Sequence, residues 1–169
     1  MKKKFGFTLG EVLITLMIVG VTASLTIPAV MNNTNQQEYK AGFKKAVSVI
    51  DQAVSMTYIE EDKDMSKYTG GSFGTVIQKR LKVTGSAGGG YYTADGMFFS
   101  AGGGGACDPD KDNTTGNICA TVTVDVNGQR PPNQMTANTR AIRDQFQIAV
   151  YPDGAVPNGA VMSQIMYGK

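Results

Sequence analysis

The chain has 169 residues, of which 41% are hydrophobic and 18% charged, and its formal net charge is +2 at neutral pH. This length allows one globular domain with an additional segment, and the near balance of charges gives no indication of a nucleic-acid-binding surface. The sequence contains no histidine, the commonest general base, and its glycine-rich stretches do not form a phosphate-binding loop, so we do not expect an enzyme.

The N-terminal region combines three lysines at positions 2–4 with an apolar run over residues 7–31, whose single formal charge is Glu11. At about 1.5 Å per helical residue this run is long enough to cross a hydrocarbon core of about 30 Å. Because positive residues stay on the cytoplasmic side, we expect residues after the run to lie outside the cytoplasm. A removed secretory signal peptide is a weaker interpretation, since the run exceeds the usual apolar region of such peptides.

Residues 6–11 read G-F-T-L-G-E and join the lysines to the apolar run. This stretch resembles the N-terminal cleavage and methylation motif of type IV pilins and type II secretion pseudopilins, although Gly10 stands where that family usually has an aliphatic residue. The resemblance implies that a prepilin peptidase cuts between Gly6 and Phe7 and methylates Phe7. It also implies a bacterial inner-membrane protein that self-assembles with other pilins or pseudopilins, served by an assembly platform and an ATPase.

The acidic residue Glu11 requires a physical explanation, because a carboxylate just inside a membrane helix is costly unless a cation offsets its charge. A cut after Gly6 creates such a cation, the α-amino group of Phe7, which can pair with Glu11 of a neighbouring copy. An acidic group in the first turns also suits the helix dipole. The alternative is that Glu11 lies at headgroup depth and stays solvated without a partner.

Gly20 and Pro28 are the two residues inside the apolar run that we expect to matter for assembly. Glycine allows neighbouring helices to approach closely, and proline lacks an amide hydrogen and is expected to bend or locally open the helix. The resemblance places Pro28 where family members carry a proline in the filament core. A proline simply tolerated in a membrane helix is the alternative interpretation.

Residues 32–62 are expected to form an amphipathic half of the same helix, because apolar side chains recur at spacings of three and four from Tyr39 to Tyr58. The acidic cluster at residues 60–64 is expected to end it, since acidic groups oppose the dipole at a helix C-terminus. Two helices broken at residues 32–35 are an alternative, because asparagine is a poor helix former.

Residues 63–169 are expected to form a globular α+β head domain. Residues 72–83 predict a short helix with Ser72 as a possible cap. Aromatic runs on both sides of Asp95-Gly96 predict a hairpin, and residues 118–126 and 145–151 predict further strands, giving about four antiparallel strands. The predicted fold class is therefore α+β, with a long N-terminal helical spine packed on a small antiparallel sheet, and it again resembles pilins.

Cys107 and Cys119 are the only cysteines, and outside the cytoplasm we expect them to form a disulfide. The loop between them carries Asp108, Asp110 and Asp112 at alternate positions, a spacing that can converge on a hard cation. The EF-hand pattern fails, because Asn113 replaces its glycine and a cysteine replaces its final glutamate. Some pseudopilins bind calcium near their C-terminal sheet, so a looser calcium site is one hypothesis and a solvated acidic turn is the other.

The sequence therefore predicts a structural subunit of a type IV pilus-like or type II secretion pseudopilus filament. Its expected parts are a leader over residues 1–6, a transmembrane and filament-core helix over 7–31, an amphipathic half over 32–62 and the head over 63–169. The layout leans towards a type II secretion pseudopilin. The alternative is a cell-surface binding module that does not polymerise and is held by an uncleaved N-terminal anchor.

Overall fold

The computed structural model describes residues 6–168. It consists of two compact units, one ending at Gln37 and the other beginning at Glu38, and each is described by itself below. The first unit is helical, and the second combines helices with a β-sheet. The lysines of the predicted leader lie outside the described residues.

The N-terminal helix α1 spans Leu9–Glu60. It is continuous through the asparagines at residues 32–35, so the alternative of two helices broken there is wrong. It is also continuous through Pro28, so a locally opened helix at that residue is not observed. The helix ends at the acidic cluster, as predicted, and there Glu60 accepts hydrogen bonds from Lys79, at 2.8 Å, and from Arg80.

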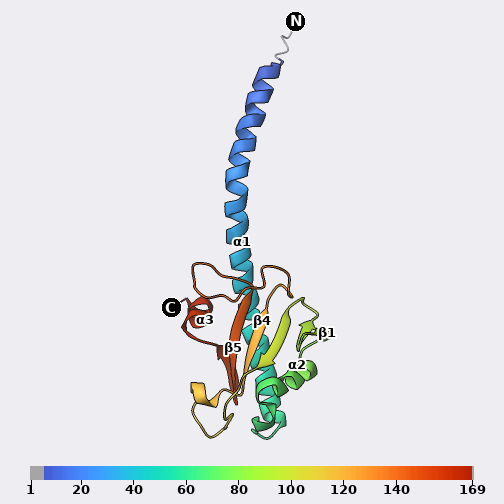
Figure 1. Ribbon diagram of the computed structural model, residues 1–169, viewed down its shortest axis with the longest axis vertical. Coiled ribbons are helices and arrows are strands. Elements are labelled where there is room, and N and C mark those ends of the chain that lie inside the picture. Colours follow the sequence, from blue (N-terminus) through green and yellow to red (C-terminus); the bar gives the residue numbers. More distant parts are fainter. Residues whose placement is uncertain (1–5, 169) are drawn as a thin grey trace. The chain divides into compact units, whose positions relative to one another are not determined.

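The second unit is organised on an antiparallel sheet of six strands in which each strand pairs with the next along the chain (Figure 1). The strands are β1 (Val83–Ala87), β2 (Gly90–Thr93), β3 (Phe98–Gly102), β4 (Ala120–Asp125), β5 (Gln145–Tyr151) and β6 (Gly154–Pro157). The predicted hairpin is confirmed, since Tyr92 pairs with Phe98 across the Asp95-Gly96 turn. The sheet has two more strands than expected, because β1 is an exposed edge strand without apolar alternation and β6 is short.

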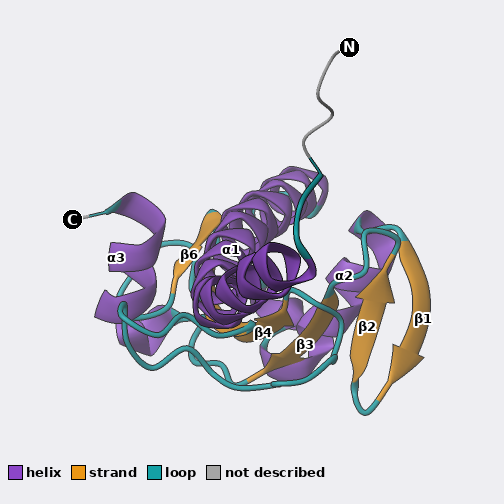
Figure 2. Cartoon of the chain, turned by 90° about the horizontal axis from the view of Figure 1, so that it is seen from above, coloured by secondary structure: helices purple, strands orange, loops and turns teal. Residues whose placement is uncertain are grey.

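The core of the second unit lies between the sheet and the amphipathic part of α1. Phe43 and Phe146 stack with ring centroids 4.5 Å apart, and both are fully buried. Farther along α1, Ile50 and Val54 are also fully buried. Figure 2 shows α1 crossing the sheet above β4. The chain therefore has an α+β fold in which a long N-terminal helix packs on an antiparallel sheet, as the sequence predicted.

Two short helices flank this core. The predicted helix over residues 72–83 is shorter than expected: a 3-10 helix, η2 (Gly70–Phe73), leads into α2 (Gly74–Arg80), and Ser72 does not cap it. A C-terminal helix, α3 (Ala160–Tyr167), was not predicted. Figure 2 shows α2 beside β2 and β3, and α3 beside β6. Further 3-10 turns are η1 (Ser66–Tyr68) and η3 (Thr115–Asn117).

Candidate functional site

The start of α1 contains a reciprocal set of hydrogen bonds between Thr8 and Glu11. The backbone N–H of Thr8 donates to Glu11 Oε2 at 2.7 Å, and the backbone N–H of Glu11 donates to Thr8 Oγ1 at 3.2 Å. The Thr8 hydroxyl also donates to Glu11 Oε2, at 2.9 Å. Thr8 directly precedes the first helical residue, so this is a capping box. The sequence reasoning missed Thr8, although threonine followed three residues later by glutamate is the signal of this motif.

The capping box gives Glu11 a partner within its own chain. All three hydrogen bonds leave Glu11 Oε1 without a described protein donor, so the carboxylate can cap its helix and still accept a hydrogen bond from an amine. An unsatisfied backbone N–H at a helix start is itself costly in lipid. Glu11 can therefore act in two ways, by capping its own helix and by pairing with a cation. The sequence analysis considered the pairing and not the capping hydrogen bonds.

The apolar half of α1 presents its side chains outward on every side. Each large apolar side chain from Leu9 to Met31 is exposed, and Phe7 is 88% exposed. In the described part of the chain α1 is the one helix that is long and apolar enough to cross a membrane, with a mean hydropathy of 2.1 over its most apolar window. Such a surface is stable in lipid or against other apolar helices, so this half can act as a membrane anchor.

The two residues predicted to matter for assembly lie on this apolar helix. A Cβ added at Gly20 would meet no other atom within 4 Å, so its surface is open to a neighbouring helix. Pro28 lies inside α1 and is exposed with the residues around it. Neither residue is brought close to Glu11 by the fold, because each lies turns away on the same helix. Their roles in assembly stay predictions.

The predicted disulfide between Cys107 and Cys119 is formed, and both residues are fully buried. The bridge closes the loop that precedes β4. Next to it, the backbone N–H of Gly70 donates to the carbonyl of Cys119 at 2.8 Å. The bridge therefore fixes one end of the loop against the η2 segment.

The loop inside the disulfide is held by an asparagine. The Asn117 side chain, which is 2% exposed, accepts the backbone N–H of Asp108 at 2.7 Å. Its amide nitrogen donates to the carbonyls of Asp108 at 2.9 Å and Lys111 at 3.1 Å. These carbonyl oxygens are of the type that calcium prefers, and here a side-chain amide occupies the position between them.

The aspartates proposed for calcium are not gathered into a site. Over residues 6–168 no group of three or more histidine, cysteine, aspartate or glutamate side chains is placed to hold a metal ion. Asp108 uses Oδ2 for an ion pair with Lys111 at 3.0 Å and Oδ1 to accept the backbone N–H of Asp110. The ion pair with Lys111 holds the pKa of Asp108 below its usual value. Asp108, Asp110 and Asp112 are therefore not gathered around one position in this conformation, and calcium binding stays a hypothesis.

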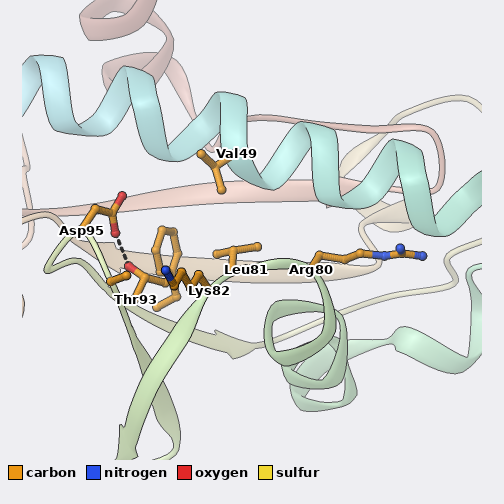
Figure 3. A pocket seen from close by; sticks show the side chains of 8 residues that line it. Val49, Arg80, Leu81, Lys82, Thr93 and Asp95 are labelled. Carbon is orange, nitrogen blue, oxygen red and sulfur yellow. Dashed lines mark hydrogen bonds between the residues drawn. The ribbon is translucent and has the colours of Figure 1, made fainter.

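A small cavity of about 290 Å³ lies between α1 and the β2–β3 hairpin (Figure 3). Its walls are mainly apolar, with Val49 from α1 facing Leu81 and Phe99. Its carboxylate, Asp95, is already paired with Lys45 at 2.8 Å and hydrogen-bonded by Thr93. Burial disfavours ionisation of Asp95, but these two partners outweigh it and lower the pKa of that carboxyl. In this cavity the Asp95 carboxylate therefore links α1 to the hairpin through its ion pair with Lys45.

Residues 70–74 read G-G-S-F-G and match the G-x-S-x-G pattern of a hydrolase nucleophile. That pattern requires a sharp turn from a strand into a helix, with a histidine to activate the serine. Here the segment is the 3-10 helix η2 running into α2, and the chain contains no histidine. The sequence therefore matches the pattern, but the segment has neither the strand-to-helix turn nor the histidine that the pattern requires in a hydrolase.

The N-terminal segment is the candidate functional site, because it joins the capping box, the exposed Phe7 and the apolar helix in one continuous stretch. Comparison of the chain with protein-family models, with curated proteins and with solved structures finds no match.

Proposed function

We propose that this chain is a precursor of a pilin-like filament subunit, cut between Gly6 and Phe7, methylated at Phe7, and assembled from the bacterial inner membrane. The observation that carries the proposal is the G-F-T-L-G-E stretch at the start of an apolar helix that is exposed on all sides. In this proposal the second unit is the pilin-like head domain, outside the cytoplasm, and the chain serves a type IV pilus-like or type II secretion pseudopilus filament.

The exposed apolar helix supports assembly for a physical reason. Lipid covers its large apolar side chains before assembly, and neighbouring copies of the same helix can cover them in a filament. Contacts that relate one copy to the next without closing on themselves generate an open helical array. The open surface at Gly20 allows close packing of such helices. A filament subunit therefore uses the same surface in both states.

The first test is the mass of the N-terminus after co-expression of the full chain with a prepilin peptidase. We expect loss of residues 1–6 and one added methyl group on Phe7. A Gly6→Leu variant is the matched control, and we expect it to keep the full leader because its side chain blocks the cleavage position. Recovery of the parent chain with an intact leader in the presence of active peptidase would contradict the proposal.

The second test separates the two roles of Glu11. Glu11→Gln keeps an oxygen that can accept the Thr8 N–H, so the cap is retained and the charge is lost. Thr8→Ala keeps the charge and weakens the cap, at a cost of about 1 kcal/mol. If charge pairing drives assembly, Glu11→Gln is processed normally but gives at least about tenfold fewer filaments, equivalent to about 1.4 kcal/mol. Thr8→Ala then assembles nearly as well as the parent.

A second candidate function is a membrane-anchored binding module that is neither cut nor polymerised. The capping box favours it to a degree, because Thr8 satisfies Glu11 within the uncut chain and no new amine is required. The same mass measurement separates the candidates, since this one predicts an intact leader. Equal behaviour of Glu11→Gln and the parent in every assembly assay would also favour it.

A further inference from the structure

Five basic residues lie on two segments of the second unit that meet near the start of that unit. We call this surface the basic end; it consists of Lys40 and Lys44 on α1 and Arg130, Arg140 and Arg143 on the loop between β4 and β5. Figure 1 shows this loop, in orange-brown, beside the part of α1 where the second unit begins. Direct contact joins the two segments, because a Cβ added at Gly42 would lie 3.0 Å from Val126.

The loop that carries the three arginines has a fixed conformation. The fully buried carboxylate of Asp144 accepts the backbone N–H groups of Asn133 at 2.8 Å and Gln134 at 2.9 Å. Farther along, Thr136 Oγ1 accepts the backbone N–H of Arg143 at 2.9 Å and donates to its carbonyl at 3.0 Å. The arginines are therefore presented by an ordered backbone, and their side chains are exposed.

The charges of the basic end are not neutralised by the acids around it. Within residues 6–168 none of its five side chains has a carboxylate within ion-pair distance, whereas the neighbouring Lys45 is paired with Asp95. Asp144 and Asp125 are buried and accept hydrogen bonds from the side-chain amides of Asn127 and Gln145, and neither is in an ion pair with the five basic side chains. A second cavity, between α1 and Val126 of this loop, is lined by Arg130 and by two exposed acids, Glu38 and Asp95. The surface therefore has an excess of positive charge open to a ligand.

Chain length alone restricts where this surface can lie if the apolar half of α1 spans a membrane. Lys40, the first residue of the basic end, follows Met31, the end of the apolar run, by nine residues. In the continuous helix α1 nine residues span about 14 Å, of which the headgroup layer takes about 5–7 Å. Lys40 then lies within about one Debye length of the headgroups, the range over which exposed lysine and arginine attract anionic lipid.

We infer that the basic end binds the headgroups of anionic phospholipids in the membrane that holds α1, and so restricts the second unit before assembly. The inference rests on the proposed membrane anchoring. A second copy of the chain is the competing partner, because acidic residues gather on segments far from the basic end, at residues 60–64 and 108–112. The continuity of the basic end with the span favours lipid.

The chain has no tryptophan, so one introduced tryptophan reports a single position. We would place it at Met135, which is 38% exposed on the loop of the basic end, and at Met56, which is 56% exposed on α1 and farther along the chain, as the control. The full chain is reconstituted into vesicles that contain brominated phosphatidylglycerol or brominated phosphatidylcholine, since bromine quenches tryptophan at short range. Flotation with phosphatidylcholine vesicles reports the anchoring by itself.

We expect Met135→Trp to be quenched at least about twofold more by the anionic lipid than by the zwitterionic one, and Met56→Trp to be quenched equally by both. High salt should remove the difference, because these are exposed charges. Changing the five basic residues to glutamine should also remove it, whereas Lys63→Gln, Lys82→Gln and Lys111→Gln together should not.

Each of the other outcomes overturns the inference. A chain that floats but shows equal quenching of Met135→Trp in both lipids retains its anchor and lacks the headgroup contact. If quenching of Met135→Trp changes with the number of protein chains per vesicle and not with the charge of the lipid, the basic end binds a second copy of the chain. A chain that floats with neither lipid removes the membrane anchoring together with the inference.

Discussion

Asp144 offers the sharpest test of how the β4–β5 loop is held. Its carboxylate is fully buried and is hydrogen-bonded by three neutral donors: the backbone N–H groups of Asn133 and Gln134, at 2.8 and 2.9 Å, and Asn127 Nδ2 at 3.0 Å. No other side chain connects both ends of this loop by so many hydrogen bonds among the described residues. Replacing Asp144 with alanine removes all three acceptor contacts at once.

The expected loss of stability follows from these three bonds. A hydrogen bond to a charged group contributes about 1.5–3 kcal/mol, but the alanine variant no longer has a carboxylate to desolvate. Asn133 and Gln134 are exposed, so water can reach their freed N–H groups. We therefore take about 1 kcal/mol for each bond and expect Asp144→Ala to lower the free energy of unfolding by about 3 kcal/mol. Asp144→Asn keeps one oxygen and should lose about half as much.

The assay is urea unfolding of the full chain in detergent micelles, combined with hydrogen exchange of the loop amides. A loss of about 3 kcal/mol corresponds to about a hundredfold lower protection of these amides. The matched control is Asp110→Ala, an exposed aspartate, which should lie within about 0.5 kcal/mol of the parent. If Asp144→Ala unfolds with the parent and the amides of Asn133 and Gln134 keep their protection, the loop is held by other contacts and the reasoning is wrong.

Four further predictions depend on the contacts described above. Because Lys45 helps to lower the pKa of Asp95 in the folded chain, the Lys45–Asp95 ion pair contributes its full stability above the ordinary aspartate pKa and loses it as the pH falls through the lowered pKa. Urea midpoints of the parent and Asp95→Asn should therefore differ at pH 6 and start to converge only below about pH 4, where the ordinary aspartate pKa is passed. Asn117→Ala should cost about 2 kcal/mol in thermal unfolding, and calorimetric titration of the parent with calcium should give no binding heat at millimolar concentration. Changing Cys107 and Cys119 to serine should cost about 2–3 kcal/mol in urea unfolding, since the closed loop is short, and an unchanged midpoint would refute that.

The sequence predicted those parts of the fold that depend on local pattern. The amphipathic half of α1 follows from periodic apolar residues such as Phe43 and Ile50, and the β2–β3 hairpin follows from Asp95-Gly96. The edge strand β1 has no such pattern, because four of its five residues are exposed and its hydrogen bonds come from β2. Its existence depends on tertiary pairing, which short-range patterns do not show.

The candidate site combines what a resemblance implied with what only the structure shows. Gly6 and Phe7 were identified from the resemblance of residues 6–11 to the pilin cleavage motif, and Glu11 as the single charge of the apolar run, whereas the role of Thr8 became visible only in its hydrogen bonds to Glu11. The calcium hypothesis treated alternate aspartates as convergent. It did not consider Asn117, which comes later in the chain and bonds the same loop through its amide. Which side chain fills the centre of a loop is decided by three-dimensional closure and not by spacing.

The serine and threonine hydroxyl groups of α1 differ in their hydrogen-bond partners between the two halves of the helix. Between Leu9 and Gln37 every serine and threonine hydroxyl donates to a carbonyl three or four residues earlier, and these residues are Thr15, Thr22, Ser24, Thr26 and Thr34. In the amphipathic half the exposed Ser48 accepts a hydrogen bond from Gln52 instead, and the buried Thr57 donates to the carbonyl of Ala53. A hydroxyl without a partner is costly in lipid or in a core, whereas in water the solvent supplies one. The change in bonding therefore agrees with a helix whose first half is surrounded by apolar material and whose second half has one face in the protein core and one in water.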